Sequence, residues 1–519
     1  MDSSNNGIRW WPAIIIDVLA ILALVFLWAR DAPSRQYLVL LTTIILIIYA
    51  GLLLLWLLFF SRLRWRTRLV CFAVIVLMFA FSALLFRLRG FNGDLIPIFE
   101  WRWTNRVDES MDGNTLETSE LATEEWQPSP NDYPQFLGPN RNPIVHGIKL
   151  ARDWSARPPR LLWRQPIGAG WSAFAVVGNF AITQEQRGEQ EMVVCYSLKS
   201  GDIKWTHSDK ARFEEIPTGV GPRATPTIVQ NRVYTLGATG ILNCLELGTG
   251  KRLWSVNIVE DNNARVHDWG MSGSPLVLND GIVVSAGGQD NMSLVAYHTE
   301  TGERIWGSGN AEAGNSSPLV TTLADVRQIL IFNKGNVAAH HPLTGQMLWE
   351  YPWSTNTEHV AQPVPLPGDR VFVSSGYGIG SKLLQIQRDV QDNWHVSLIW
   401  ETRQLKAKFT NVVYRDGYIY GLDDGILVCL DIADGQRKWK RGRYGHGQMI
   451  LVDDLLLVQA EAGDVVLVEA NPNSVGKEVA RFPALAGRTW NNPALAGAYL
   501  LVRNDREAAC YELPLESSR

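Results

Sequence analysis

The stretch CLDIADGQRKW, residues 429–439, has the pattern of two short β-strands joined by a tight turn. Apolar residues alternate up to an Asp-Gly pair, and a tryptophan follows the turn glycine by four positions. Taken alone, the stretch fits one hairpin among many, a loop with a reactive cysteine, or part of a cofactor signature. The rest of the chain decides between these interpretations, because the same pattern recurs.

Four other stretches align with it on the turn glycine and the tryptophan. They are CYSLKSGDIKW (195–205), CLELGTGKRLW (244–254), AYHTETGERIW (296–306) and AHHPLTGQMLW (339–349). With divergent copies included, and with a phenylalanine in the tryptophan place of the last, the anchors are Trp163, Trp205, Trp254, Trp306, Trp349, Trp400, Trp439 and Phe482. They lie 39 to 52 residues apart, a period typical of propellers and solenoids.

Each period is β-rich. The stretch TPTIVQNRVYTLGATGILNCLEL (225–247) predicts three short alternating strands, and the strand with the next tryptophan is the fourth. The last period lacks a fourth strand, which RLLWRQP (160–166) can supply from the start of the repeats. Closing the ring with both chain ends removes exposed sheet edges. The sequence thus predicts an all-β, eight-bladed propeller of four-stranded antiparallel blades over residues 133–519.

The repeat alignment also interprets the cysteines. Cys195, Cys244, Cys429 and Cys510 share one column on equivalent strands of different blades, so they cannot ordinarily reach one another. We therefore expect small buried side chains and no disulfides. The adjacent histidines at 340 and 341 occupy a strand end without a second ligand cluster nearby, and no metal site is predicted.

Three apolar runs precede the repeats, at 11–29, 37–60 and 69–86, and each is long enough to span a membrane. A cleaved signal peptide would be a single short run, so residues 1–89 are predicted to be a membrane anchor with three transmembrane helices. Asp17 is the one acid inside these runs. It could face a partner helix, but its place near the end of the run favours a tolerated carboxylate at the membrane interface.

Arginine counts predict the orientation. The loop between the second and third runs carries four arginines and the first loop carries two. Because positive loops stay in the cytoplasm, the N-terminus is expected inside and everything after residue 90 outside. In a bacterium with two membranes, the anchor would lie in the inner membrane and the propeller in the periplasm.

Residues 90–132 are predicted to be an acidic flexible linker. Its part from 104 to 132 has eight acidic residues and one arginine, and few aliphatic residues to build a core. The whole chain of 519 residues has a net charge of −4. No basic stripe runs along the repeats, so a nucleic-acid partner is not expected.

The repeat resembles the PQQ-like propeller repeat, in which a tryptophan docks between blades. YPQFLGPNRN (133–142) is similar to the PQFRGPNR leader of a poorly characterised bacterial group of such proteins. Two better-known groups share the repeat. The resemblance implies either a quinoprotein dehydrogenase, which uses pyrroloquinoline quinone (PQQ) and calcium, or a BamB-type scaffold of outer-membrane assembly, which has no cofactor.

The departures from both groups are informative. Many quinoprotein alcohol dehydrogenases stack the quinone under a disulfide of adjacent cysteines, and this chain has no Cys-Cys pair. Its blades also lack the long insertions that build their cofactor chamber. Membrane glucose dehydrogenases do place a propeller after transmembrane helices, as this chain does. BamB-type scaffolds carry a lipoprotein cysteine, which three helices replace here.

The starts of the inner strands are unusually polar and would surround one mouth of the central channel. Nine residues form this candidate ring: Arg223, Asp268, Trp269, Asn315, Lys408, Arg443, His446, Trp490 and Asn491. The three cations could receive carboxylates of a quinone, and the carboxylate and amides could offer oxygen ligands to calcium. The tryptophans could stack on a flat ring, and the histidine could act as a base. The alternative is that these loops are polar because they form exposed turns.

Two functions from different classes follow. The first is a membrane-tethered periplasmic scaffold that binds envelope proteins or a small ligand through its loops. The alternative is a membrane-bound PQQ-dependent dehydrogenase that oxidises an alcohol or sugar and feeds the quinone pool. We expect the scaffold, without an assured cofactor, because the catalytic residues of the dehydrogenases find no match here. A ligand sensor is a third possibility, but the chain has no cytoplasmic segment large enough for an output domain.

Overall fold

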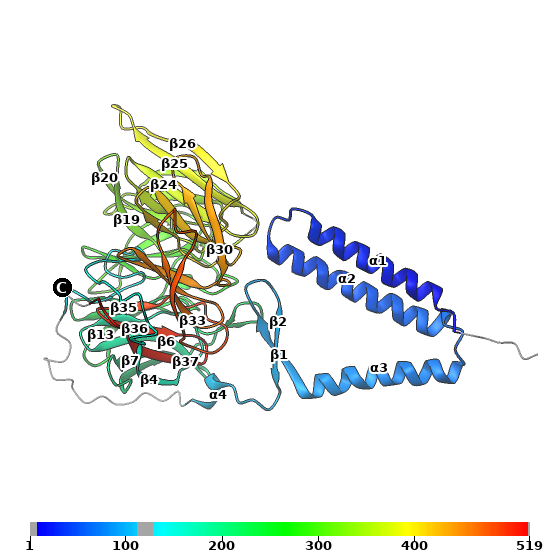
Figure 1. The fold of residues 1–519 in the computed structure, drawn as a ribbon. Helices are drawn as coiled ribbons and strands as arrows, with labels where there is room; N and C mark the ends of the chain where they lie inside the picture. The colour runs from blue at the N-terminus through cyan, green and yellow to red at the C-terminus, as the bar shows by residue number, and fades with distance from the viewer. Residues whose placement is uncertain (1–7, 112–127, 356, 517–519) are drawn as a thin grey trace, which may run out of the picture. The chain divides into compact units, whose positions relative to one another are not determined.

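The computed structural model describes residues 8–111, 128–355 and 357–516, which fall into two compact units (Figure 1). The first unit is Met1–Asn105 and the second is Arg106–Arg519. Residues 112–127, the central part of the predicted flexible linker, lie outside the described residues.

The first unit contains three helices long and apolar enough to cross a membrane, as the hydropathy pattern predicts. They are α1 (Trp11–Ala29), α2 (Arg35–Leu55), which continues as the π-helical turn η1 (Trp56–Phe60), and α3 (Trp65–Leu85). A hairpin of β1 (Phe86–Phe91) and β2 (Pro97–Trp101) follows directly. This hairpin occupies the first part of the segment predicted to be a linker.

Asp17 faces a neighbouring helix, which is the less favoured of the two predicted possibilities. The Tyr49 hydroxyl on α2 donates a hydrogen bond of 2.9 Å to Asp17 Oδ1 on α1. A polar group at membrane depth is costly unless it has a partner. The tyrosine supplies that partner, and its position could not be inferred from the apolar run alone.

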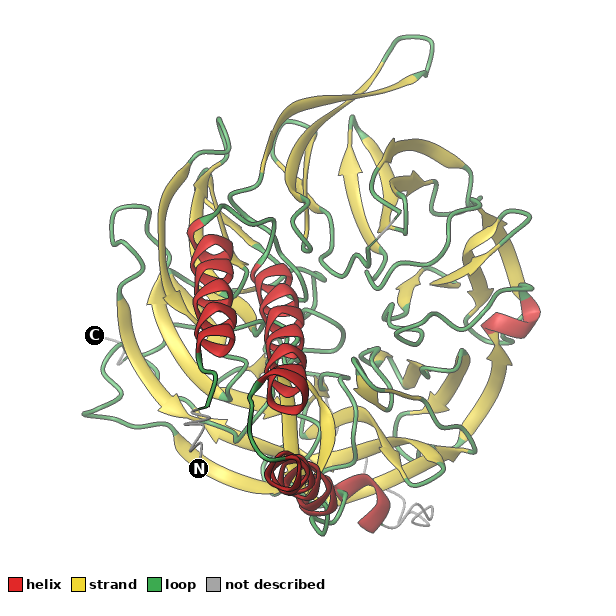
Figure 2. Ribbon diagram, turned by 90° about the vertical axis from the view of Figure 1, so that its right-hand side faces the viewer, coloured by secondary structure: helices red, strands yellow, loops and turns green. Residues whose placement is uncertain are grey.

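The second unit is a propeller whose blades surround a common centre (Figure 2). Numbered along the chain, blade 1 comprises β5 (Ala175–Val177), β6 (Phe180–Arg187), β7 (Gln190–Ser197) and β8 (Ile203–Asp209). Blade 2 comprises β11 (Thr227–Val229), β12 (Arg232–Leu236), β13 (Ile241–Glu246) and β14 (Arg252–Asn257). Blade 3 comprises β15 (Leu276–Leu278), β16 (Gly281–Gly288), β17 (Met292–His298) and β18 (Arg304–Ser308).

The next three blades repeat the arrangement. Blade 4 comprises β19 (Leu319–Leu323), β20 (Val326–Phe332), β21 (Asn336–His340) and β22 (Met347–Pro352). Blade 5 comprises β23 (Val364–Leu366), β24 (Arg370–Ser375), β25 (Gly380–Arg388) and β26 (Trp394–Thr402). Blade 6 comprises β27 (Val413–Arg415), β28 (Tyr418–Asp423), β29 (Ile426–Asp431) and β30 (Arg437–Arg443).

Blades 7 and 8 close the ring. Blade 7 comprises β31 (Gln448–Val452), β32 (Leu455–Gln459), β33 (Asp464–Glu469) and β34 (Glu478–Pro483), with β3 (Ile144–Val145) added in parallel to β31. Blade 8 comprises β35 (Ala494–Ala496), β36 (Tyr499–Arg503), β37 (Glu507–Glu512) and β4 (Arg160–Pro166). Since β4 pairs antiparallel with β37, the predicted closure by both chain ends is confirmed.

Short elements complete the unit: α4 (Val107–Ser110), α5 (Ile258–Asp261), β9 (Glu214–Glu215) and β10 (Gly219–Val220). Asp108 on α4 pairs with Arg212 at 3.2 Å, and its carbonyl accepts from Gly188 N at 2.7 Å. Asp108, inside the segment predicted to be a flexible linker, is therefore bound to the chain next to blade 1.

The buried apolar side chains form eight clusters, and each cluster lies between two neighbouring blades. The propeller thus has a separate small core at every blade interface. The cysteine column contributes to these cores, because Cys195, Cys244, Cys429 and Cys510 are fully buried and unpaired. Burial raises the pKa of the Cys429 thiol to about 12, so it is inert at neutral pH.

The anchor tryptophans connect each blade to the next. The Trp205 indole N–H donates to the Leu247 carbonyl of the following blade at 2.8 Å, and its ring packs on Gly250 in the same turn. The same bond to the next blade is made by Trp163, Trp254, Trp400 and Trp439. Trp349 is an exception, since its N–H donates to Gln328 Oε1 of its own blade.

The tryptophan place of blade 7 differs from the prediction. The residue opposite the bulge of β33 is Ala480, which pairs with Leu467, whereas Phe482 pairs with Val465 two positions on. Gly476 precedes Ala480 by the usual four residues, so the glycine locates the column correctly. Phe482 packs instead at 5.4 Å on Trp154 and at 4.8 Å on Tyr511, measured between ring centroids.

We expect Gly250→Ala to destabilise the propeller more than Gly417→Ala. Both glycines have left-handed backbones, with φ of +70° and +87°, so each substitution carries about 1 kcal/mol of backbone strain. A Cβ at 250 also collides with the Trp205 ring, whereas one at 417 meets no atom within 4 Å. Overpacking adds about 1–3 kcal/mol to the first variant alone. Denaturant unfolding of the full chain in detergent measures both, and equal midpoints would contradict tryptophan docking as described.

Candidate functional site

The polar starts of the inner strands form a ring of hydrogen bonds that joins all eight blades. Each blade interface is crossed by a bond between a strand start and the strand start of its neighbour. The bonds are Ala173 N to Thr225 Oγ1, Thr225 N to Ser274 Oγ, Ser274 N to Ser317 Oγ, Gln362 Nε2 to Ser317 O, Gln362 N to Asn411 Oδ1, Thr410 Oγ1 to Gly447 O, Gln448 Nε2 to Trp490 O, and Asn491 Nδ2 to Ser172 O.

The side chains of this ring are buried, and their distances of 2.6 to 3.2 Å are those of good hydrogen bonds. No strand pairing runs from one blade to the next, so these polar groups give the interfaces a directional contact that apolar packing lacks. Asn491, predicted as a calcium ligand, is one of them. Its amide also donates to Gly170 O at 3.2 Å, which orients it toward blade 1.

The leader segment at 133–145 lies inside the channel. Tyr133 bridges to Val176 of blade 1, the Pro134 carbonyl accepts from Ile228 of blade 2, and β3 pairs with β31 of blade 7. The segment therefore crosses from one side of the ring to the other.

Arg141 holds the middle of this leader in place. It is 4 % exposed, and its guanidinium donates to the carbonyls of Ser274 and Pro275 in blade 3 and of Pro318 in blade 4. Burial lowers its pKa to about 9. The arginine of the leader motif thus has a structural role, because it bonds the leader to blades 3 and 4.

Five half-buried aromatic residues meet at the strand-start end of the channel. Their ring centroids form a chain of contacts: Trp171–Trp490 at 4.8 Å, Trp490–Phe409 at 5.0 Å, Phe409–Trp269 at 5.9 Å, and Trp269–Tyr377 at 6.3 Å. They come from blades 1, 8, 6, 3 and 5. The contact between blades 3 and 6 spans the mouth, and we call these five residues the aromatic mouth.

Two buried cations contact the rings of the aromatic mouth. Lys408 Nζ lies 4.8 Å from the Tyr377 ring centroid and 5.0 Å from that of Phe409. The Arg488 guanidinium lies 4.8 Å from the Trp171 ring and 4.5 Å from the Trp490 ring. Both cations are buried and engage ring faces, where a desolvated cation–π contact contributes about 2 kcal/mol.

The other predicted ring residues are dispersed. Asn315 is buried, accepts from Ser272 Oγ at 2.9 Å and donates to Glu358 at 3.0 Å. His446 is buried with its ring 5.7 Å from Phe409, and its backbone N–H donates to Glu461. Arg443 is exposed and donates to the Asp424 carbonyl at 3.0 Å, and Asp268 is exposed. The structure thus brings together Trp269, Lys408, Trp490 and His446 around Phe409.

The oxygen ligands suggested for calcium, Asp268 with Asn315 or Asn491, lie in different surroundings. Asp268 is exposed, and Asn315 Oδ1 accepts from Ser272 Oγ at 2.9 Å. Asn491 is buried and donates through its Nδ2 to Ser172 O, while its Oδ1 has no hydrogen-bond partner among the described residues. Within the described part of the chain, no group of three or more His, Cys, Asp or Glu side chains could hold a metal ion.

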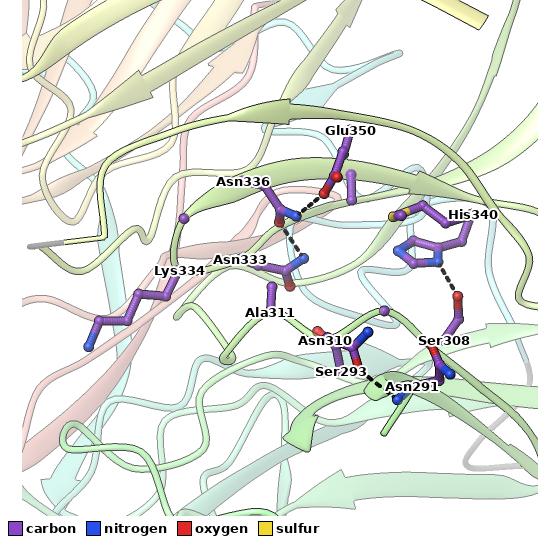
Figure 3. A pocket seen from close by; sticks show the side chains of 14 residues that line it. Asn291, Ser293, Ser308, Asn310, Ala311, Asn333, Lys334, Asn336, His340 and Glu350 are labelled. Carbon is purple, nitrogen blue, oxygen red and sulfur yellow. Dashed lines mark hydrogen bonds between the residues drawn. The ribbon is translucent and has the colours of Figure 1, made fainter. Parts of the chain in front are cut away.

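A separate pocket of about 490 Å³ lies between blades 3 and 4, and none of the nine predicted residues line it (Figure 3). Asn336 accepts from Asn333 at 2.9 Å and donates to Glu350 at 2.7 Å. His340 Nδ1 lies 3.0 Å from Ser308 Oγ, and burial lowers the pKa of this histidine, which keeps it neutral. Amides and hydroxyls dominate the lining, so its chemistry suits neutral polar groups.

A family model described as outer membrane protein assembly factor BamB matches residues 152–268 and 189–441, which together cover more than half of the chain. The chain belongs to this family. BamB of Salmonella typhimurium is 25 % identical over 351 residues, which cover 64 % of this chain and 84 % of that protein. BamB of Escherichia coli is 25 % identical over 350 residues, with the same coverage of 64 % and 84 %.

Two solved structures share the propeller fold. BamB from Moraxella catarrhalis has a TM-score of 0.50 at 14 % identity, covering 68 % of this chain and 100 % of that one. A quinohemoprotein alcohol dehydrogenase from Pseudomonas putida has a TM-score of 0.54 at 12 % identity, covering 75 % and 81 %. Identities this low show the fold alone. The two structures represent the scaffold group and the dehydrogenase group that share the repeat.

Within this BamB-type chain, three residues of the aromatic mouth were not predicted from the sequence, Trp171, Tyr377 and Phe409, nor was the cation Arg488 that contacts it. A signal was present, because an aromatic residue directly precedes the bonded polar residue in blades 1, 6 and 8, at Trp171, Phe409 and Trp490. Tyr377 lies in the turn between β24 and β25, which the glycine-rich sequence presented only as a hairpin. Which residues meet across the channel is decided by the ring geometry.

Arg223 and Glu191 form the charged border of the mouth. Arg223 donates to Thr218 Oγ1 at 3.1 Å and to Gly219 O at 3.0 Å, and lies 4.4 Å from the Phe213 ring centroid. Burial lowers its pKa to about 9. Burial raises the pKa of Glu191 to about 7, although the Ala238 N–H, which donates to it at 2.8 Å, and Arg223 oppose the shift.

Glu191 should make the propeller less stable as pH rises. Its folded pKa exceeds the unfolded value, so the folded state binds the extra proton between about pH 4.5 and 7 and loses that advantage across this window. We expect the fall in melting temperature from pH 5 to 7.5 to be smaller in Glu191→Gln than in the wild type.

Glu189→Gln is the matched control, because the Glu189 side chain is 77 % exposed and should leave the pH profile unchanged. Thermal melts of the full chain in detergent at several pH values provide the measurement. Parallel profiles for the wild type and Glu191→Gln would contradict the prediction.

Proposed function

We propose that this BamB-type chain is a membrane-tethered scaffold whose propeller binds an envelope protein at the aromatic mouth. The main observation that supports this proposal is the aromatic mouth. It consists of five half-buried aromatic side chains from five blades, and buried Lys408 and Arg488 contact their rings. Rigid aromatic side chains dominate protein interfaces because they bury a large area at a small entropic cost. The names of the related proteins, outer membrane protein assembly factors, support a protein partner.

The proposed location is the inner membrane of a bacterium, with the propeller in the periplasm. Three helices support the tether. Arg62 and Arg64 in the loop before α3, with Arg66 and Arg68 in its first turn, support a cytoplasmic position for that loop.

The dehydrogenase is the second candidate, favoured by the structural likeness to a quinohemoprotein alcohol dehydrogenase and by Arg223 and Lys408 near the mouth. PQQ would supply hydride or electron transfer from an alcohol. Two observations oppose it. Lys408 lies against two aromatic rings, and Asn315 Oδ1, one of the oxygens suggested for calcium, accepts a hydrogen bond from Ser272.

Site-specific photocrosslinking in cells tests the scaffold. A photoreactive residue at Trp269 should capture one defined envelope protein, and Phe409→Ala should weaken that capture severalfold because it removes a supporting ring. The matched control is Leu343, which is 64 % exposed in the turn between β21 and β22, at the opposite end of the blade by strand direction. Equal capture from both positions would contradict recognition by the mouth.

PQQ binding separates the two candidates. Full chain in nanodiscs is incubated with PQQ and calcium, passed over a desalting column, and assayed for retained quinone and dye-linked alcohol or aldose oxidation. We expect no stoichiometric retention. Retention of one quinone per chain that disappears in Arg223→Ala or Lys408→Ala would overturn the scaffold in favour of the dehydrogenase.

A further inference from the structure

The hairpin of β1 and β2 is fixed to the end of the third membrane helix. β1 begins at Phe86, directly after the last residue of α3. Arg102, just beyond β2, returns to that helix end: its backbone N–H donates to Leu85 O at 2.8 Å and its side chain to Ala83 O at 2.9 Å. These carbonyls belong to the last helical turn, where partners within the helix are lacking. The base of the hairpin therefore lies at the boundary that α3 reaches.

The tip of the hairpin is fixed to the same boundary by a different helix. Asp94, in the turn between β1 and β2, forms an ion pair of 2.9 Å with Arg35 at the first residue of α2. In a chain that crosses the membrane three times, α2 begins and α3 ends on the same side. Base and tip are thus both held at one membrane surface, which lays the hairpin along that surface.

The two faces of the hairpin differ in chemistry. The register pairs Phe86 with Trp101 and Leu88 with Phe99, so these four side chains share one face. They are 37 %, 52 %, 43 % and 61 % exposed, respectively. Phe86 and Trp101 contact each other with centroids 4.6 Å apart.

The opposite face is charged. Arg87 pairs with Glu100 across the strands, with Nε 2.9 Å from the carboxylate, and Arg89 approaches the other oxygen at 3.9 Å. A two-stranded sheet with one bare apolar face is marginal in water. At a membrane surface the bilayer can cover such a face, since aromatic side chains favour the boundary between headgroups and acyl chains.

We propose that the hairpin is an interfacial membrane element, with Phe86, Leu88, Phe99 and Trp101 inserted at the lipid headgroup boundary. The ligand of this face is the bilayer itself. Two observations support this proposal: the base of the hairpin is continuous with α3, and its tip is held by the ion pair between Asp94 and Arg35. The element fixes the point at which the chain leaves the membrane, and it is independent of what the propeller binds.

Neighbouring positions on opposite faces test the proposal. In the full chain with Cys71→Ser, nitroxide labels are placed at Phe99→Cys or at Glu100→Cys, and the protein is reconstituted in nanodiscs. The four propeller cysteines are buried, so they do not compete for label. The label at 99 should collide more with dissolved oxygen, which concentrates in lipid, than with a water-soluble nickel chelate. The label at 100 should show the reverse order.

Two results would overturn the assignment. If the nickel chelate reaches both labels equally well, the apolar face lies in water. If the label at 99 is immobilised and shielded from both oxygen and nickel, protein covers the face, from the propeller or from a second copy. A second labelled pair on the same two faces, Leu88→Cys and Ile98→Cys, should show the same order, with the label at 88 favouring oxygen and the label at 98 favouring the nickel chelate.

Discussion

The indole rings of five anchor tryptophans bond one blade to the next, where the strands of neighbouring blades do not pair. Trp205 shows the full contact: its face packs on a turn glycine of the next blade, and its N–H bonds to the carbonyl of Leu247 before that turn. One side chain thereby fixes both the distance and the angle between two blades. Repetition of this contact accounts for most of the seven anchor positions among the 21 tryptophans, and it explains why a turn glycine accompanies the tryptophan.

A second constraint acts at the other end of each blade. The ring of polar strand starts bonds blade to blade, and Arg141 joins three of the carbonyls beside it from inside the channel. A buried polar group without a partner costs about 1–3 kcal/mol, so these residues are committed to each other. Serine, threonine, glutamine and asparagine at these positions therefore serve the closure of the propeller. In blades 1, 6 and 8 the residue before the bonded one is aromatic, and these side chains belong to the aromatic mouth, for which we propose a role in recognition.

The sequence allowed the eight blades, the closing strand at 160–166 and the inert cysteine column to be predicted because each is a local pattern that repeats. The prediction for Phe482 was wrong: the spacing from Gly476 places Ala480 in the tryptophan column, two residues before the phenylalanine. The nine predicted ring residues include two kinds of residue, those that bond neighbouring blades and those that form the aromatic mouth. Asn491 belongs to the bonded ring, whereas Trp269 and Trp490 belong to the mouth. Their separation depends on side-chain direction across a ring, which no single repeat encodes.

The width of the mouth bears on what it can hold. Trp269 and Phe409 come from opposite sides of the channel, and their centroids are 5.9 Å apart in an edge-to-face arrangement. A flat ligand stacked between two rings needs about 3.5 Å on each side, or a separation of about 7 Å with parallel planes. A quinone held that way would have to turn one ring and part the pair, and would break its contacts with Trp490 or Tyr377. A protein segment could contact the outer faces of the same rings without moving them, and this difference supports our proposal of a protein partner over a planar cofactor.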